Sequence, residues 1–119
     1  MHEFGICERI VEGVLEELNR VDPPPRLIKS RLVVGRLHQL IPEHMRFAYE
    51  VLTRDTPAAG SELEVIVKPI TGRCRACGWE GEIEPPFFRC GECKERAIET
   101  IGGRELYLDS LEIETDEPE

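Results

Sequence analysis

Apolar side chains recur at helical spacing along the first twenty residues. Between Glu3 and Arg20 they fall at steps of three and four, which places them on one helix face. These positions are Cys7, Ile10, Val11, Val14, Leu15 and Leu18. Asp22 and three consecutive prolines follow, and prolines cannot continue a helix because they lack a backbone donor. The pattern predicts an amphipathic helix that ends near Arg20, with Cys7 as a small core residue.

A strand and a second helix are predicted next along the chain. Partial alternation over 26–35, with Ile28, Leu32 and Val34 on one face, indicates the strand. Pro42 suits the first turn of a helix that continues to about Arg54. Its expected buried stripe consists of Met45, Phe47, Ala48, Tyr49, Val51 and Leu52.

Two further strands complete the predicted sheet. Residues 62–69 alternate after a loop over 55–61, so the segment 26–69 is a strand, helix and strand with parallel strands and a right-handed crossover. A last strand spans Leu106 to Ile113, with a slip of its apolar phase near Asp109. The expected fold is α/β: two helices on a small mixed three-stranded sheet. Two helices of this length cover one face only, which leaves the other face for self-association or a partner.

Residues 71–104 differ in composition from the rest of the chain. They contain four cysteines and too few large apolar residues to form a core alone. We therefore expect two domains: residues 1–70 with 105–119, and an inserted metal-binding module at 71–104.

The four cysteines have the spacing of a tetrathiolate zinc site. Cys74 and Cys77, and likewise Cys90 and Cys93, form two C-x2-C knuckles that each present two sulfurs to one ion. Gly78 and Gly91 are expected to allow the tight backbone of the knuckles. Four thiolates fill a tetrahedral ion, so the zinc is predicted to be structural.

Other uses of the same cysteines agree less well with the sequence. A thioredoxin-like site needs its C-x2-C pair at the start of a helix, and the gap of twelve residues would leave a rubredoxin-type iron poorly shielded. A nucleic-acid ribbon would use a local basic cluster, but nearby acidic residues offset it. The basic residues are Arg73, Arg75, Arg89, Lys94 and Arg96; the acidic ones are Glu80, Glu82, Glu84, Glu92 and Glu95.

Charge and composition further narrow the functional classes to which the protein can belong. The 119-residue chain has 24 acidic and 15 basic residues, and its net charge of -9 disfavours nucleic acid as a partner. No run of apolar residues is long enough for a membrane span, and the N-terminus lacks the features of a signal peptide. Five cysteines without a leader indicate reduced thiols and a cytoplasmic protein. No open metal position and no base and nucleophile pair can be recognised, so an enzyme is not expected.

The amino terminus offers a second metal-binding arrangement. The terminal amine, the first backbone nitrogens and the His2 imidazole can close the five- and six-membered chelate rings that Ni(II) or Cu(II) favours. The alternative is a terminal histidine that is simply exposed.

The sequence resembles the HypA/HybF family of hydrogenase maturation nickel chaperones over essentially the whole chain. The resemblance is carried by Met1-His2-Glu3, Val33-Val34-Gly35, Pro42, Arg46-Phe47-Ala48-Tyr49-Glu50 and the two knuckles. It implies that His2 binds nickel, that Glu3 lies near the nickel site, and that the four cysteines bind zinc. It also implies a HypB-type GTPase and the hydrogenase large-subunit precursor as partners. A homodimer is a further possibility.

The chain departs from the family pattern before the second helix, where Ile41 replaces an acidic residue. A carboxylate ligand from that loop is therefore not expected. His38 and His44 lie near this position and are interpreted as surface residues, and the insert contains no histidine. The alternative function at this point is a zinc-ribbon adaptor that binds nucleic acid or a protein assembly.

Overall fold

The computed structural model describes residues 2–115, except for the side chain of His2. The chain forms two compact units. The first, here the helical unit, comprises the residues up to Leu32, Leu40–Ile66 and the residues from Tyr107 onward. The second, here the cysteine unit, comprises Val33–Gln39 and Val67–Leu106. Neither of the two α-helices in the described part of the chain is long and apolar enough to cross a membrane.

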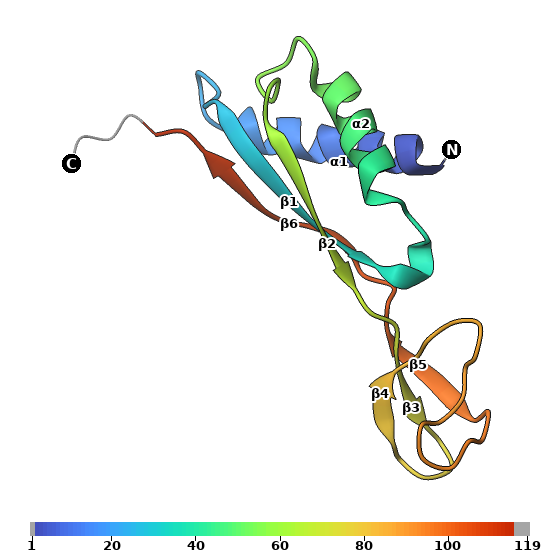
Figure 1. Ribbon diagram of the computed structural model, residues 1–119. Helices are drawn as coiled ribbons and strands as arrows, with labels where there is room; N and C mark the ends of the chain where they lie inside the picture. The colour runs from blue at the N-terminus through green and yellow to red at the C-terminus, as the bar shows by residue number, and fades with distance from the viewer. Residues whose placement is uncertain (1, 116–119) are drawn as a thin grey trace. The chain divides into compact units, whose positions relative to one another are not determined.

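Two helices and a three-stranded sheet form the α/β part of the chain. The helices are α1 (His2–Leu18) and α2 (Pro42–Thr53), and the strands are β1 (Leu27–Gly35), β2 (Glu62–Lys68) and β6 (Leu106–Ile113). The strand order is β2-β1-β6, and Figure 1 shows β1 and β2 running in the same direction and β6 opposite to them. Beyond β6, Glu114 N donates to Arg26 O at 2.9 Å. The predicted mixed sheet is confirmed.

The buried face of α1 forms much of the core of the helical unit. The residues on it are at most 5% exposed: Cys7, Val11, Val14 and Leu18. Val14 and Leu18 cluster with Leu27 and Ala58, and Leu108 and Leu111 of β6 pack against this cluster. Because these two leucines are three residues apart and both reach the core, the predicted slip of the apolar phase in β6 is confirmed.

Two predicted core positions are wrong. Ile28 is 41% exposed, and its neighbour Leu27 takes the buried place beside Val14 and Leu18. Phe47 on α2 is 63% exposed. It lies two residues beyond Met45, about 200° around the helix, so it cannot share the buried face that Met45 defines. That face also carries Ala48, Tyr49 and Thr53.

A chain of hydroxyl groups links β1, α2 and the loop before β2. Ser61 Oγ donates to Ala58 O at 2.6 Å and therefore accepts from Tyr49 Oη, 2.6 Å away. Tyr49 Oη in turn accepts from Ser30 Oγ at 2.9 Å. Ser30 and Tyr49 are both at most 1% exposed, so the hydrogen bond between them is shielded from solvent.

Replacing Tyr49 with phenylalanine should destabilise the protein. The substitution leaves the buried Ser30 hydroxyl without its acceptor, which costs about 1–3 kcal/mol in the free energy of unfolding. Chemical denaturation should show this loss, whereas Tyr107→Phe, at a position 48% exposed, should change little. An unchanged unfolding midpoint for Tyr49→Phe would show that the hydroxyl chain contributes no stability.

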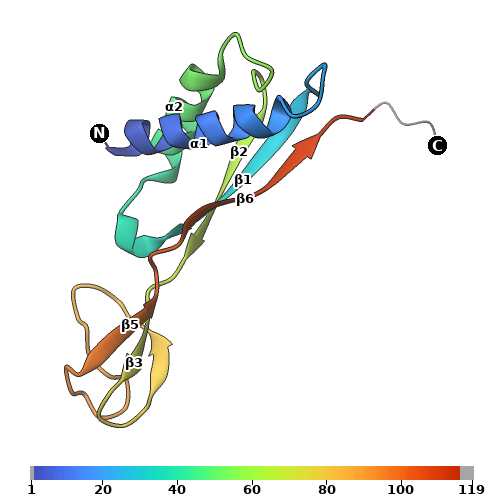
Figure 2. The same ribbon diagram turned by 180° about the vertical axis from the view of Figure 1, so that it is seen from behind.

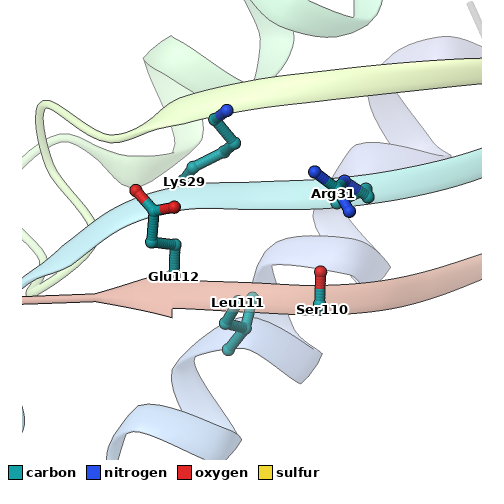
Figure 3. Close-up of a pocket in the computed structure, with 5 residues that line it drawn as sticks. All are labelled: Lys29, Arg31, Ser110, Leu111 and Glu112. Carbon is teal, nitrogen blue, oxygen red and sulfur yellow. The ribbon is translucent and has the colours of Figure 1, made fainter.

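Both helices lie on one side of the β2-β1-β6 sheet, and the opposite face is charged. In Figure 3 Leu111 points toward the helices, whereas Ser110 and Glu112 stand on the same side as Lys29 and Arg31. Arg31 Nε donates to Glu64 Oε1 at 2.8 Å. This hydrogen bond lowers the pKa of Glu64 and raises that of Arg31. The expected open face is therefore present, and its side chains are ionic rather than apolar.

The cysteine unit contains a second antiparallel sheet that the sequence did not predict. Its strands are β3 (Thr71–Cys74), β4 (Glu80–Glu82) and β5 (Ile98–Gly102), in the order β4-β3-β5. Figures 1 and 2 show these short strands beside the loops that follow them. A short 3-10 helix, η1 (Arg36–His38), also belongs to this unit. Its few buried apolar side chains are those of Val33, Val34, Ile70 and Ile83, together with Cys74 and Cys90.

Candidate metal centres

The four cysteines of the two knuckles meet in the cysteine unit. All four sulfurs lie within 4.8 Å of one another, with Cys74 and Cys93 at 3.7 Å and Cys77 and Cys90 at 3.5 Å. A tetrahedral zinc ion with Zn–S bonds of about 2.3 Å would hold its sulfurs about 3.8 Å apart. The cluster therefore has the dimensions of a four-thiolate site, and such a site leaves no open position for substrate. All five cysteines of the chain are free of disulfide bonds.

The two knuckles have the same backbone construction. Cys74 N donates to Trp79 O at 2.7 Å, and Cys90 N donates to Glu95 O at 3.0 Å, five residues ahead in each case. The residue after the second cysteine of each pair has a positive φ, 85° at Gly78 and 65° at Lys94. Only the first knuckle fills this left-handed position with glycine, which adopts it without steric cost.

Glycine is expected in each knuckle because a side chain there would clash or force an unfavourable φ. At Gly91 the clash is the reason, because its φ is not positive. A Cβ at this position would lie 2.7 Å from Cζ2 of Trp79, which packs against the backbone of the second knuckle. Sequence reasoning missed Trp79, although the only tryptophan of the chain, two residues after a knuckle cysteine, was a signal for such a packing role.

Hydrogen bonds from backbone N–H groups contribute to different pKa values for the thiols of Cys90 and Cys93. Burial acts to raise the pKa of Cys90, but the backbone N–H groups of Cys93 and Glu92, 3.3 and 3.2 Å from its sulfur, contribute to a net decrease to about 6. The backbone N–H of Glu95 acts to lower the pKa of Cys93, yet burial and the neighbouring sulfurs raise it to about 12. A metal ion that binds here must therefore displace protons from some of the thiols, so the affinity of the cluster for the ion should fall in acid.

The second predicted centre lies at the start of α1. The side chain of His2 is outside the described part of the structure. Glu3 lies in the first turn and is 13% exposed at its side chain; its Oε2 accepts from Ile41 N at 3.3 Å. The same oxygen is 4.0 Å from Nδ1 of His44. The residue after His2 is thus tied to the residue before α2, a contact that no pattern in the sequence predicts.

The remaining histidines and Cys7 are not gathered around a metal position in the described structure. His44 is exposed, as predicted, and His38 is half-buried, with its Nε2 2.9 Å from Arg104 O. Cys7 is fully buried and donates to Met45 O at 3.4 Å. Burial, with a contribution from Glu3, raises its pKa to about 11, which keeps the thiol protonated.

Comparison with known proteins gives one consistent family. The family model described as HypA, hydrogenase/urease nickel incorporation, metallochaperone, matches residues 1–113. The hydrogenase maturation factor HypA of Desulfosudis oleivorans is 35% identical over 95% of this chain and 98% of its own length. That of Trichodesmium erythraeum is 37% identical, over 96% of each chain.

Solved structures agree with the fold. The solution structure of the Ni metallochaperone HypA from Helicobacter pylori aligns with a TM-score of 0.60 over 93% of this chain and 96% of its own, at 15% identity. A second solution structure, of a HypA protein, gives a TM-score of 0.65 at 16% identity, over 95% of this chain and 96% of its own. These likenesses support the α/β fold with its cysteine-rich module.

Proposed function

The chain belongs to the HypA family of nickel-incorporation metallochaperones, and we propose that it carries Ni(II) at its amino terminus for the maturation of [NiFe]-hydrogenase. The observation that carries the proposal is the family match over residues 1–113, which includes His2 and all four knuckle cysteines. In this proposal the helical unit holds the nickel and the cysteine unit holds a structural zinc. The function is not enzymatic.

The sulfur cluster supports separate binding sites for zinc and nickel. Cys74, Cys77, Cys90 and Cys93 fit a tetrahedral zinc ion, which would fold and stiffen the cysteine unit. Because four thiolates complete the coordination of that ion, the transported nickel needs ligands elsewhere. The His2 imidazole, the terminal amine and the first backbone nitrogens supply the nitrogen donors that Ni(II) prefers.

Glu3 contributes by holding the start of α1 in place. Its carboxylate accepts a hydrogen bond from Ile41 N, so it ties the nickel-binding terminus to the segment before α2. We assign it a positioning role next to the nickel. A site with few protein ligands at a chain terminus releases its ion more readily than a closed cage, which suits a protein that must pass nickel on.

The partners in this proposal follow from the family. They are a HypB-type GTPase and the hydrogenase large-subunit precursor, in the cytoplasm, with a homodimer as a possible oligomeric form. A zinc-ribbon adaptor for nucleic acid or a protein assembly is the competing function.

A chelator challenge tests the proposal. Purified full-length protein loaded with Ni(II) should hold about one nickel and one zinc, and brief EDTA treatment should remove the nickel while the zinc remains. The nickel-loaded protein should also restore hydrogenase activity in an extract that lacks it. If nickel stays after EDTA while zinc leaves, or if the protein binds DNA with a steep dependence on salt and no nickel, the metallochaperone assignment is wrong.

A further inference from the structure

An exposed aromatic and basic surface lies between β4 and the second cysteine pair. Its residues line a hollow of about 300 Å³ and are Pro86, Phe87, Phe88, Arg89 and Arg96, here the Phe-Arg patch. Phe87 is 70% exposed and Phe88 38% exposed. Two neighbouring phenylalanine rings in water forgo the free energy that burial would provide, so such a surface indicates a contact site.

Backbone hydrogen bonds hold the loop that carries the patch. Phe87 N donates to Glu84 O at 3.0 Å, which closes a turn over two prolines whose φ angles are fixed by their rings. The loop begins after Ile83, whose N donates to Ile70 O at 2.8 Å, and ends at Cys90, whose N donates to Glu95 O. The patch is therefore formed before any partner arrives, which lowers the entropy cost of binding.

The two arginines of the patch are available to an external anion. Arg89 and Arg96 are exposed and form no hydrogen bond or ion pair with another residue in the described part of the chain. One acidic residue near them in the sequence, Glu84, is engaged elsewhere, because it accepts from Arg36 at 3.2 Å. A guanidinium group recognises a carboxylate through two parallel hydrogen bonds.

We infer that the Phe-Arg patch docks an acidic segment of a partner protein that carries an apolar side chain next to a carboxylate. The rings of Phe87 and Phe88 would cover the apolar side chain, and the guanidinium groups of Arg89 and Arg96 would bind the carboxylates. The inference rests on the proposed zinc site, because Cys90 fixes one end of the loop, and it adds the chemistry of the partner.

Charge favours a protein segment over a nucleic acid. The patch offers two unpaired cations, Glu92 and Glu95 follow closely in the sequence, and the whole chain carries a net charge of -9. A polyanion that needs many phosphate contacts would be repelled, whereas one or two carboxylates can be accommodated.

A peptide titration tests the inference. The probe is a blocked seven-residue peptide of alternating glutamate and leucine, added to the zinc-loaded, ¹⁵N-labelled full chain up to millimolar concentration. Backbone resonances of residues 86–96 should shift, and Phe87→Ser and Arg96→Gln should each weaken the affinity roughly tenfold. Phe47→Ser, which removes a comparably exposed ring from α2, should leave the affinity unchanged.

Three outcomes would overturn the inference: no shift at millimolar peptide, equal binding by the two patch variants, or tighter binding of a seven-nucleotide single-stranded DNA at the same residues.

Zinc content and nickel affinity are measured on every variant. Both patch side chains are exposed, so zinc and nickel binding should remain native. Native metal binding together with lost peptide binding supports the docking surface, and a defect in nickel binding alone would count instead against the proposed nickel site at the amino terminus.

Discussion

Replacing Cys90 with serine is expected to remove zinc from the protein and unfold the cysteine unit. Cys90 is 1% exposed, its sulfur lies 3.5 Å from that of Cys77, and it accepts two backbone N–H groups. Besides the cysteines, the unit buries only a few apolar side chains, those of Val33, Val34, Ile70 and Ile83, so we expect metal binding to supply a large part of its folding free energy. Zinc affinity should fall on the order of a hundredfold or more.

Elemental analysis and amide resonances of the cysteine unit measure this effect. Cys7→Ala is the matched control, because Cys7 is equally buried but lies in the helical unit and donates only to Met45 O. It should keep one zinc per chain and native resonances for residues 67–106. A Cys90→Ser protein that still holds one tightly bound zinc in an unchanged fold would refute the tetrathiolate assignment.

Extending the chain by one residue before Met1 is expected to abolish most nickel binding. The extension converts the terminal amine into an amide and displaces the chelate rings that include the His2 imidazole. His2→Ala should have a similar effect because it removes the imidazole itself. Both proteins should keep their zinc, since the sulfur cluster is formed by residues 74–93 alone.

Nickel competition against a chromophoric chelator compares these proteins with the native chain. His44→Ala is a suitable control: His44 is exposed and lies 4.0 Å from Glu3, near the proposed site without being one of its ligands. It should retain most nickel affinity, and a tag at the C-terminus should be harmless. Undiminished nickel affinity in the extended and His2→Ala proteins would place the ion elsewhere, and His38 and His44 would then be the next candidates.

Periodicity and spacing were sufficient for the α/β framework and the sulfur cluster. The steps of three and four in α1 and the C-x2-C pairs are local patterns, and each is imposed by geometry that spans only a few residues. Ile28 was misplaced because the choice of buried face in a strand depends on which neighbours pack against it, whereas the exposure of Phe47 follows from its angle to Met45 around the helix. For Ile28 the decisive neighbours were Val14 and Leu18, which are distant in sequence.

The contacts that shape the candidate sites were less predictable. The sequence did not predict the three short strands of the cysteine unit, whose pairing joins residues such as Arg73 and Glu99 that carry no hydrophobic signal. The contact of Trp79 with the backbone at Gly91 and the hydrogen bond from Ile41 N to Glu3 are also long-range. Such pairings become visible only when the chain is folded.

X-ray absorption at both the zinc and nickel edges, on one sample of native protein loaded with both metals, distinguishes the two proposed sites. Zinc should have four sulfur scatterers at about 2.3 Å, and nickel should have nitrogen and oxygen scatterers that include an imidazole. Sulfur bound to nickel, or histidine bound to zinc, would show that the two metals do not divide between the cysteine cluster and His2.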